Sequence, residues 1–250
     1  MLVRRGLRPR PTPPDIPFSP DLDEAAADQL ARQLDSYAFR LFLRGAIQRW
    51  EGFRPGETTR YLQAPQSRAY AEWLVKAGLA SRLSTDRYRL IRGARSFGGT
   101  LEWYVARELR RRLQFDVASG LKTHAKGVGG DLDVVAAAEG KLVYIELKSS
   151  PPRNITAPEI CAFFDRVGRL RPHVSLFVVD TALRLTDKIL PMLVAELERR
   201  GGGVEIEPRR VERELWALTA HLYAVNARGD LISNISRAVA AGFHALAPAA

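Results

Sequence analysis

Two apolar, β-branched runs on either side of a short polar turn constrain the fold of this chain more than any other feature. The runs are residues 130–135 (GDLDVV) and 143–148 (VYIELK), and the turn Ala138-Glu139-Gly140-Lys141 contains a glycine. This composition predicts two adjacent antiparallel strands joined by a hairpin loop. A loop of two or four residues centred on Glu139-Gly140 pairs positions whose numbers sum to 279.

Four charged side chains then face one another across the hairpin. The pairing places Asp133 opposite Glu146 and Asp131 opposite Lys148. Because side chains alternate along a strand, all four project from one face. Two carboxylates that face each other repel unless a positive charge lies between them, so the pattern predicts a divalent-cation site with Lys148 beside it. The alternative is a solvated strand face on which Asp131 and Lys148 form an ordinary surface pair.

A helix is predicted over residues 100–113 (TLEWYVARELRRRL), with Thr100 as its N-cap. At about 100° per residue, one arc collects Leu101, Val105, Ala106, Leu109 and Leu113. Glu102 lies inside this arc. Outside it lie Arg107, Glu108, Arg110 and Arg111. A carboxylate on a buried face needs a partner, so Glu102 is a candidate site residue, although the helix dipole alone also favours a glutamate in the first turn.

These segments together resemble the PD-(D/E)xK restriction-endonuclease-like nucleases. The helix with Glu102, the strand with Asp133 and the strand ending in Glu146-Leu147-Lys148 carry the resemblance, and residues 129–148 are similar to the core of archaeal Holliday-junction resolvases. It covers about residues 97–208. It implies an α/β domain with a mixed sheet that hydrolyses phosphodiester bonds with a bound metal, with DNA favoured over RNA as substrate.

In that family the matching positions form the metal site. The resemblance implies that Mg²⁺, for which Mn²⁺ can substitute, is bound by Glu102, Asp133, Glu146 and the backbone carbonyl of Leu147. Lys148 would assist the attacking water. Asp131 remains the alternative to Asp133 for the aspartate position of the motif. Two departures are visible: Leu132 replaces the proline of the motif, and no glutamine occurs between Ser149 and Arg200.

The balance of charges favours a polyanionic partner. The formal net charge is +10 and the pI about 10.2, and most of the positive charge is arginine, which makes bidentate phosphate contacts. A proteome rich in arginine would produce the same bias. The three predicted metal carboxylates and Lys148 carry a net charge of −2. Such a site suits a divalent cation and would repel a phosphate without one, so metal dependence is expected.

The single cysteine, Cys161, excludes an intramolecular disulfide and favours a reducing compartment. No apolar run reaches the length of a membrane span. Residues 1–20 are basic and rich in proline, without the apolar stretch of a secretory signal. We expect a cytoplasmic protein whose first 20 residues form an extended arm.

Residues 21–95 predict a small, mainly helical domain that resembles a winged helix. Its elements are a long helix from about Asp21 to Arg49, a short helix over Thr58–Gln63, a helix over Gln66–Ala77 and two short strands around Ser84-Thr85-Asp86. In a winged helix the last helix enters a DNA groove and the hairpin meets phosphates, although such domains also bind proteins. The candidate nucleic-acid-binding residues are Gln66, Arg68, Tyr70, Lys76, Arg82, Arg87 and Arg89, with Arg153 after the catalytic hairpin.

The rest of the nuclease-like domain, residues 96–208, alternates helices over 157–170 and 183–200 with strands over 174–179 and 204–207. The role of residues 209–250 is left open. A homodimer is an option because family members often cut two strands as dimers. Two rival interpretations remain: a nuclease-like fold without activity that docks on DNA, and an α/β domain whose acidic hairpin is accidental.

Overall fold

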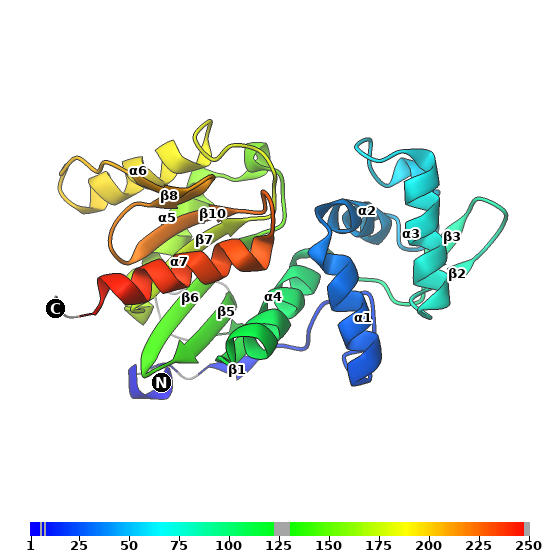
Figure 1. Cartoon of the computed structure of the whole chain (residues 1–250), viewed down its shortest axis with the longest axis horizontal. Helices are drawn as coiled ribbons and strands as arrows, with labels where there is room; N and C mark the ends of the chain where they lie inside the picture. The colour runs from blue at the N-terminus through cyan, green and yellow to red at the C-terminus, as the bar shows by residue number, and fades with distance from the viewer. Residues whose placement is uncertain (6, 8, 123–130, 248–250) are drawn as a thin grey trace. The chain divides into compact units, whose positions relative to one another are not determined.

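The computed structural model describes residues 1–5, 7, 9–122 and 131–247 of the chain. The chain divides into two compact units (Figure 1). The sheet unit comprises Met1–Thr12 and Val105–Ala250, and the helical unit comprises Pro13–Tyr104. The sequence predicts boundaries after residues 20, 95 and 208, whereas the structure divides after Thr12 and Tyr104.

The sheet unit is built on one eight-stranded sheet. From edge to edge its strands are β1 (Arg10–Pro11), β4 (Asp116–Lys122), β5 (Asp131–Ala138), β6 (Lys141–Lys148), β7 (Val174–Val179), β10 (Leu222–Asn226), β9 (Leu215–Ala217) and β8 (Arg209–Glu212). β7 pairs in parallel with both β6 and β10, and the other described pairings of this sheet are antiparallel. The α/β fold with a mixed sheet that the sequence predicts is therefore confirmed.

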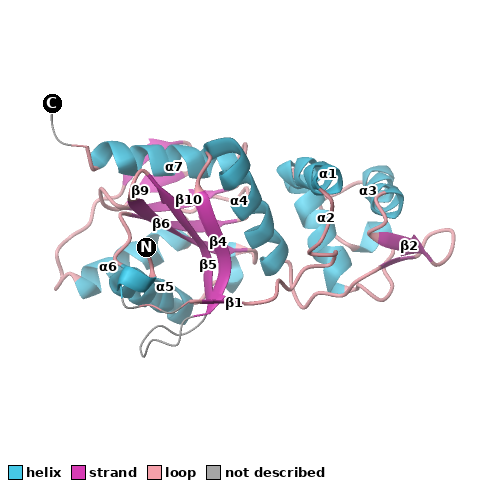
Figure 2. Ribbon diagram, turned by 90° about the horizontal axis from the view of Figure 1, so that it is seen from below, coloured by secondary structure: helices cyan, strands magenta, loops and turns pink. Residues whose placement is uncertain are grey.

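Helices cover both faces of this sheet (Figure 2). α5 (Ala157–Leu170) and α6 (Ile189–Arg200) lie on one face, and α7 (Leu231–Ala245) packs against β7 and β10 on the other. Gly242 permits a close approach of α7, because a Cβ atom there would be 2.5 Å from the Val174 side chain. Two single-turn 3-10 helices complete the unit, η1 (Val3–Arg5) and η3 (Pro152–Asn154).

Three aromatic rings form the centre of the core between the sheet and α5. The ring of Phe163 on α5 lies 5.9 Å from that of Tyr144 on β6 and 5.2 Å from that of Phe177 on β7, measured between centroids. All three side chains are fully buried. Aromatic pairs at these separations add to the stabilisation from buried area. The packing holds α5 against the strand that carries Glu146 and Lys148.

The β5–β6 hairpin has the predicted register. Val134 pairs with Ile145, and the pairs continue in step down to the loop. Glu139 and Gly140 form the loop with φ angles of 49° and 74°. Two consecutive positive φ angles are typical of the two-residue loops whose twist matches the flanking strands. Gly130, the first residue of the predicted strand, lies outside the described residues.

Two elements after the hairpin differ from the prediction. Residues 204–207 form no strand. Val204 is exposed, so the alternating apolar and polar side chains of this segment do not pack against the core. α6 begins at Ile189 and not at residue 183. The sheet continues instead through β8, β9 and β10, which all belong to the C-terminal segment whose role the sequence left open. β10 pairs in parallel with β7, and parallel strands are not joined by a short turn that could be recognised in the sequence.

The helical unit contains three helices followed by a hairpin, but two of the helices differ from the prediction, because residues 58–63 form no helix and the long helix predicted before them is divided in two. Its elements are α1 (Glu24–Asp35), α2 (Tyr37–Gln48), η2 (Pro55–Glu57), α3 (Ala64–Lys76), β2 (Ala80–Arg82) and β3 (Tyr88–Leu90). β2 and β3 pair antiparallel. Helix α4 (Gly98–Leu113) begins in this unit and ends in the sheet unit.

The single long helix predicted over residues 21–49 is broken at Ser36. The backbone of Ser36 is extended, with φ −75° and ψ 118°, and its hydroxyl accepts the N–H of Phe39 at 3.4 Å. Arg40 is fully buried and donates to the carbonyl of Asp35 at 3.0 Å. Both contacts satisfy backbone groups that a helix end leaves unpaired. They separate α1 from α2 although the apolar periodicity continues through the break.

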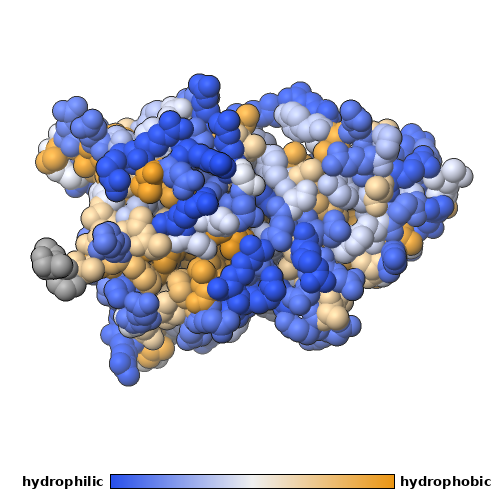
Figure 3. Space-filling model, in the orientation of Figure 1, coloured by the Kyte–Doolittle hydropathy of each residue, from blue (hydrophilic) through white to orange (hydrophobic). Residues whose placement is uncertain are grey.

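The surface of the chain is largely hydrophilic on the face seen in Figure 3. The exposed large apolar side chains include Tyr61 and Ile91 of the helical unit. Across the described residues, no helix has the combination of length and apolarity that a membrane span requires.

Candidate functional site

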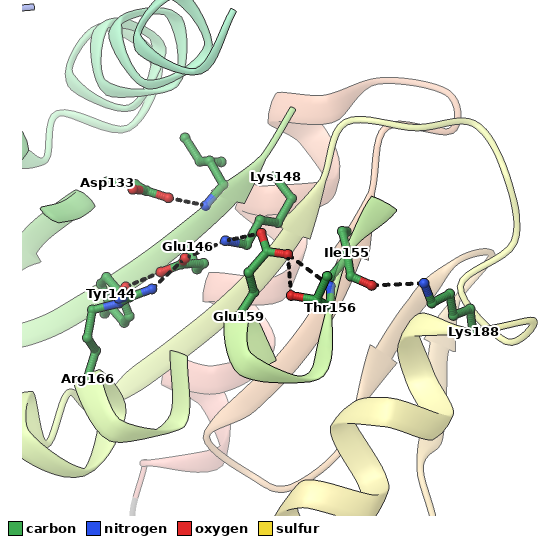
Figure 4. Close-up of polar contacts among 10 residues, drawn as sticks. Asp133, Tyr144, Glu146, Lys148, Ile155, Thr156, Glu159, Arg166 and Lys188 are labelled. Atoms are coloured by element: carbon green, nitrogen blue, oxygen red, sulfur yellow. Dashed lines mark hydrogen bonds and ion pairs between the residues drawn. The ribbon is translucent and has the colours of Figure 1, made fainter. Parts of the chain in front are cut away.

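Asp133 lies where strands β5 and β6 separate. The last described pair of these strands is Val134 with Ile145. One residue further on, the Asp133 carboxylate accepts the backbone N–H of Leu147 through Oδ2 at 2.7 Å (Figure 4). The side chain therefore enters the space between the strands beside Glu146, on the side of the hairpin that the sequence predicts.

Glu146 is buried and accepts hydrogen bonds from three side chains. Its residue is 2% exposed. Oε1 accepts from Nη2 of Arg166 at 2.7 Å and lies 3.0 Å from Nζ of Lys148. Oε2 accepts from the hydroxyl of Tyr144. A buried carboxylate is tolerated only with such partners, and these are charge-assisted contacts of the stronger kind.

Tyr144 and Arg166 close a ring of hydrogen bonds around Glu146. Nε of Arg166 donates to the Tyr144 oxygen at 2.8 Å. The hydroxyl has one proton, and because its oxygen accepts from Arg166, that proton goes to Glu146. Burial, and then the charge of Glu146, hold the pKa of Tyr144 well above its ordinary value. Tyr144 is therefore a permanent donor in this ring.

Lys148 bridges two carboxylates from different elements. Its Nζ lies 3.0 Å from Glu146 and 3.2 Å from Oε1 of Glu159 on α5. Burial alone would lower the pKa of Lys148, but the two glutamates outweigh it and raise the pKa above its ordinary value. Lys148 therefore stays protonated and can donate to an anionic oxygen.

Glu159 is placed by the start of α5. The sequence Thr156-x-x-Glu159 forms a capping box, in which Oε2 of Glu159 accepts the backbone N–H and the hydroxyl of Thr156, both at 2.9 Å. This leaves Oε1 for Lys148. The preceding loop is fixed by Lys188, whose Nζ donates to the carbonyls of Arg153 and Ile155 at 2.9 and 2.8 Å.

The charge of Asp133 is not balanced as well as that of Glu146. Burial and the neighbouring Glu146 raise the pKa of Asp133 to about 7, against the lowering effect of the Leu147 N–H, Lys148 and Arg166. Two adjacent carboxylates, one of them hard to ionise, are an arrangement that a bound cation would relieve.

The carboxylate oxygens of this site suit a hard divalent cation, and Asp133 is more available to bind it than Glu146. Carboxylate oxygens are the ligands that Mg²⁺ prefers, and no described residue donates to Oδ1 of Asp133 in a hydrogen bond that the structure shows. Both oxygens of Glu146, by contrast, already accept from protein donors. Within the described ranges, no group of three or more His, Cys, Asp or Glu side chains is placed to hold a metal ion.

The third predicted carboxylate, Glu102, is not tested by this geometry. It is half-buried on the part of α4 that belongs to the helical unit, whereas Asp133 and Glu146 belong to the sheet unit. Its metal role stays a prediction. Asp131 is exposed and pairs with Lys122 of β4. It does not have the buried position that Asp133 has.

One prediction for α4 is wrong. The sequence places Glu108 outside the buried arc, but the structure buries it completely, in contact with Arg112 and with Arg111 at 3.4 Å. The helical wheel misses this because long arginine side chains cover a carboxylate without being buried themselves. Part of the basic last turn of α4 is therefore neutralised within the protein.

The predicted nucleic-acid-binding residues of α3 are mostly exposed. Gln66, Arg68 and Lys76 face solvent. Tyr70 is half-buried, with its ring 5.2 Å from that of Phe39, so it belongs in part to the core. On this surface, Gln66, Arg68 and Lys76 are therefore more accessible to a ligand than Tyr70.

The hairpin arginines differ in their surroundings. Arg82 forms an ion pair with Glu72 and lies over the ring of Tyr88. The side chain of Arg87 lies against Gly52, where a Cβ atom would be 2.8 Å from its Nε. Arg89 is exposed, as is Arg153 in η3 of the sheet unit.

Sequence reasoning missed Tyr144, Glu159 and Arg166. The signals were present: Arg166 lies on the apolar stripe of α5, three residues after Phe163 and four before Leu170, and a charge on such a stripe needs a buried partner. Tyr144 precedes Glu146 by two residues and so shares its face of the strand. The capping-box pattern identifies Glu159.

No protein-family model matches the sequence, and no curated protein matches it. Among the solved structures that are similar to the chain are two whose matches cover nearly all of it. The protein VC1899 from Vibrio cholerae is 16% identical with a TM-score of 0.56, and the match covers 96% of this chain and 60% of that one. Can2 from Sulfobacillus thermosulfidooxidans, solved in complex with cyclic tetra-adenylate, is 18% identical with a TM-score of 0.52, and the match covers 95% of this chain and 59% of that one. The chain thus spans about three fifths of each neighbour, and at these identities the likeness establishes a shared α/β fold.

Proposed function

We propose that this chain is a metal-dependent nuclease that hydrolyses phosphodiester bonds, in DNA rather than RNA. The observation that carries the proposal is the meeting of Asp133, Glu146 and Lys148 at the open end of the β5–β6 hairpin. These are the residues that the resemblance to PD-(D/E)xK nucleases selects. Fold similarity to two solved proteins supports the α/β framework of the proposal but not its chemistry.

The proposed roles follow from the contacts. Asp133 and Glu146 would hold Mg²⁺, or Mn²⁺ in its place, with Glu102 and the Leu147 carbonyl as the further ligands expected from the resemblance. When bound, the ion supplies Lewis-acid stabilisation and an acidified water. Lys148 stays protonated, so its ammonium group would donate to a phosphate oxygen or to the attacking water.

The helical unit is proposed to bind the nucleic acid as a winged-helix-like module. Its exposed Gln66, Arg68 and Lys76 on α3 would meet the groove, and Arg89 of the hairpin would meet phosphates. The formal charge of +10 supports a polyanionic partner. Can2 was solved with cyclic tetra-adenylate, and a nucleotide ligand of that kind is a second polyanion to test with this chain.

The test is a cleavage assay with purified protein and Mg²⁺, Mn²⁺ or EDTA. Linear, branched and single-stranded DNA and an RNA of the same sequence serve as substrates, each with and without cyclic tetra-adenylate. The variants are Asp133→Asn and Lys148→Ala. Lys141→Ala is the matched control, since Lys141 lies at the other end of β6 beside Glu139.

We expect metal-dependent cleavage by the wild type and by Lys141→Ala, and its loss in the two site variants. Equal cleavage by all four proteins would indicate a contaminant and remove the support for the proposal. Sedimentation of the protein with and without DNA tests whether two copies assemble to cut both strands.

A second candidate function is a nucleic-acid-binding protein whose nuclease-like site is idle. The observation that favours it is the saturation of Glu146 by Tyr144, Lys148 and Arg166. This candidate predicts binding of DNA without cleavage under every metal condition. In that case Lys148→Ala would leave the affinity for DNA unchanged.

A further inference from the structure

The site contains one more cation than the sequence predicts. Asp133 and Glu146 face two basic groups, Lys148 and Arg166, whose contacts converge on the same oxygen of Glu146. Lys148 also contacts Glu159 on α5. Glu159 adds a negative charge that offsets Arg166 in the net charge of the cluster, but two cations now contact Glu146 where the sequence predicts only Lys148.

The lone pairs of Glu146 are largely occupied. A carboxylate oxygen offers about two acceptor positions, and Oε1 uses both, one for Nη2 of Arg166 at 2.7 Å and one for Nζ of Lys148 at 3.0 Å. Oε2 accepts from Tyr144 and has one position left. A cation that binds through Oε1 must displace Arg166 or Lys148.

Arg166 is held firmly in this position. Its side chain is 8% exposed, and it emerges from the buried stripe of α5 between Phe163 and Leu170. Its Nε donates to Tyr144, whose ring stacks on Phe163. Because Arg166 is held by Tyr144, by Glu146 and by the packing of α5, a metal that binds through Oε1 requires the side chain of Glu146 to turn.

We propose that Arg166 is a positioning residue that occupies Glu146 in the metal-free protein and thereby weakens the binding of a divalent cation on its own. The inference rests on the proposed function. A Glu146 side chain that turns toward a metal breaks its buried ion pair with Arg166, and the positive charge of Arg166 repels the incoming ion. A phosphodiester adds negative charge, so the metal and the nucleic acid should bind together more tightly than either alone.

If Arg166 instead helped Glu146 to bind the metal, its removal would change the metal affinity in the opposite direction. If Arg166 and Tyr144 instead oriented Glu146 toward the metal, removal of either would weaken metal binding. The sign of the change in affinity therefore separates the two roles, and a merely structural role would change the melting temperature without changing the affinity.

The experiment is calorimetric titration of the metal-free protein with Mn²⁺ alone. We expect Arg166→Gln to bind Mn²⁺ at least tenfold more tightly than the wild type, because it removes the competing charge. Tyr144→Phe, which keeps the charge but removes one anchor of the ring, should bind about threefold more tightly. Arg169→Gln is the control, with the same change in charge on an exposed position of the same helix, and should stay within twofold of the wild type.

Unchanged or weaker binding by folded Arg166→Gln overturns the inference. Circular dichroism establishes which variants fold. If Arg166→Gln does not fold, Tyr144→Phe is the test. Unchanged or weaker Mn²⁺ binding by Tyr144→Phe then overturns the inference.

A second titration separates this inference from the proposed function. With a phosphorothioate DNA duplex present, the Mn²⁺ affinity of the wild type should rise at least tenfold, and that of Arg166→Gln by a smaller factor. If Glu146→Gln abolishes Mn²⁺ binding while Arg166→Gln does not alter it, the role of Arg166 fails and the metal site stands. If no protein binds Mn²⁺ with or without the duplex, the proposed function fails as well.

Discussion

The carboxylate of Asp133 accepts the backbone N–H of Leu147 at 2.7 Å, one residue beyond the last described pair of β5 and β6. The Asp133 side chain thus accepts a hydrogen bond that a backbone carbonyl of the facing strand would otherwise accept. The contact places Asp133 beside Glu146 at the point where the hairpin opens. Two carboxylates are kept close by a backbone hydrogen bond in spite of their repulsion, which has a measurable consequence for stability.

We expect Asp133→Asn to stabilise the metal-free protein at pH 8. The pKa of Asp133 is raised from 3.8 to about 7 by burial and by Glu146, so the folded chain keeps a proton that the unfolded chain releases between about pH 4 and 7. The stability of the wild type therefore falls as the pH rises through that window. Asparagine has no proton to lose and can still accept from Leu147.

The gain should be about 1–3 kcal/mol at pH 8 and close to zero at pH 4. Urea unfolding in EDTA at both pH values measures it. Asp131→Asn is the control, since Asp131 is exposed on the same strand, and it should change the stability little at either pH. A stability gain for Asp133→Asn that is equal at pH 4 and pH 8 would contradict the account.

Glu159 has two separable roles, and two substitutions should divide them. Glu159→Gln keeps an oxygen for the capping box with Thr156 but removes the charge beside Lys148. Glu159→Ala removes both. We expect Glu159→Ala to lower the free energy of unfolding by about 1 kcal/mol and Glu159→Gln to lower it by clearly less. Thermal unfolding of the two variants and of Thr156→Ala, which should resemble Glu159→Ala, checks the assignment.

Arg68 and Arg82 should contribute unequally to the binding of nucleic acid by the helical unit. Arg82 is paired with Glu72 within the unit, whereas Arg68 is exposed on α3. A phosphate must compete with Glu72 for Arg82, so Arg68→Ala should weaken binding more and should reduce the salt dependence of the affinity by about one contact. Fluorescence anisotropy with a DNA duplex at several salt concentrations measures both effects. Equal losses for the two variants would show that the ion pair with Glu72 does not restrain Arg82.

Two glycine substitutions should change stability in opposite directions. A Cβ atom at Gly242 would be 2.5 Å from Val174, so Gly242→Ala must push α7 away from the sheet and should cost about 1–3 kcal/mol. Gly168 on α5 has no atom within 4 Å of such a Cβ, and Gly168→Ala should stabilise the protein by about 0.5–1 kcal/mol. Denaturant unfolding of both variants provides the comparison, and destabilisation by Gly168→Ala would mean that α5 packs differently around Arg166.

The parts of the fold that the sequence predicts are those set by neighbouring residues. The β5–β6 register follows from an alternating pattern and a two-residue turn, and this pattern alone is enough to place Asp133 and Glu146 on one side of the hairpin. Helix α5 follows from its own periodicity. Where two local signals conflict, as at Ser36, the capping contacts win over the apolar periodicity.

The parts that the sequence does not predict depend on segments far apart in the chain. The ring of Tyr144, Glu146 and Arg166 forms only when α5 packs across β6. The placement of β10 beside β7 likewise joins segments separated by more than 40 residues. Two of the three partners of Glu146 are therefore missed from sequence, and one of them, Arg166, comes from another element.

The order of the strands has a consequence for how the protein is made. β10 lies between β7 and β9, so the last of the eight strands to leave the ribosome occupies an interior position of the sheet. Until Leu222–Asn226 has been synthesised, the fully buried strand Val174–Val179 (VSLFVV) has an open edge. An apolar edge of this kind pairs readily with other chains. Chains that end short of residue 222 should therefore aggregate during synthesis, and the C-terminal segment serves the solubility of the newly made protein as well as its final fold.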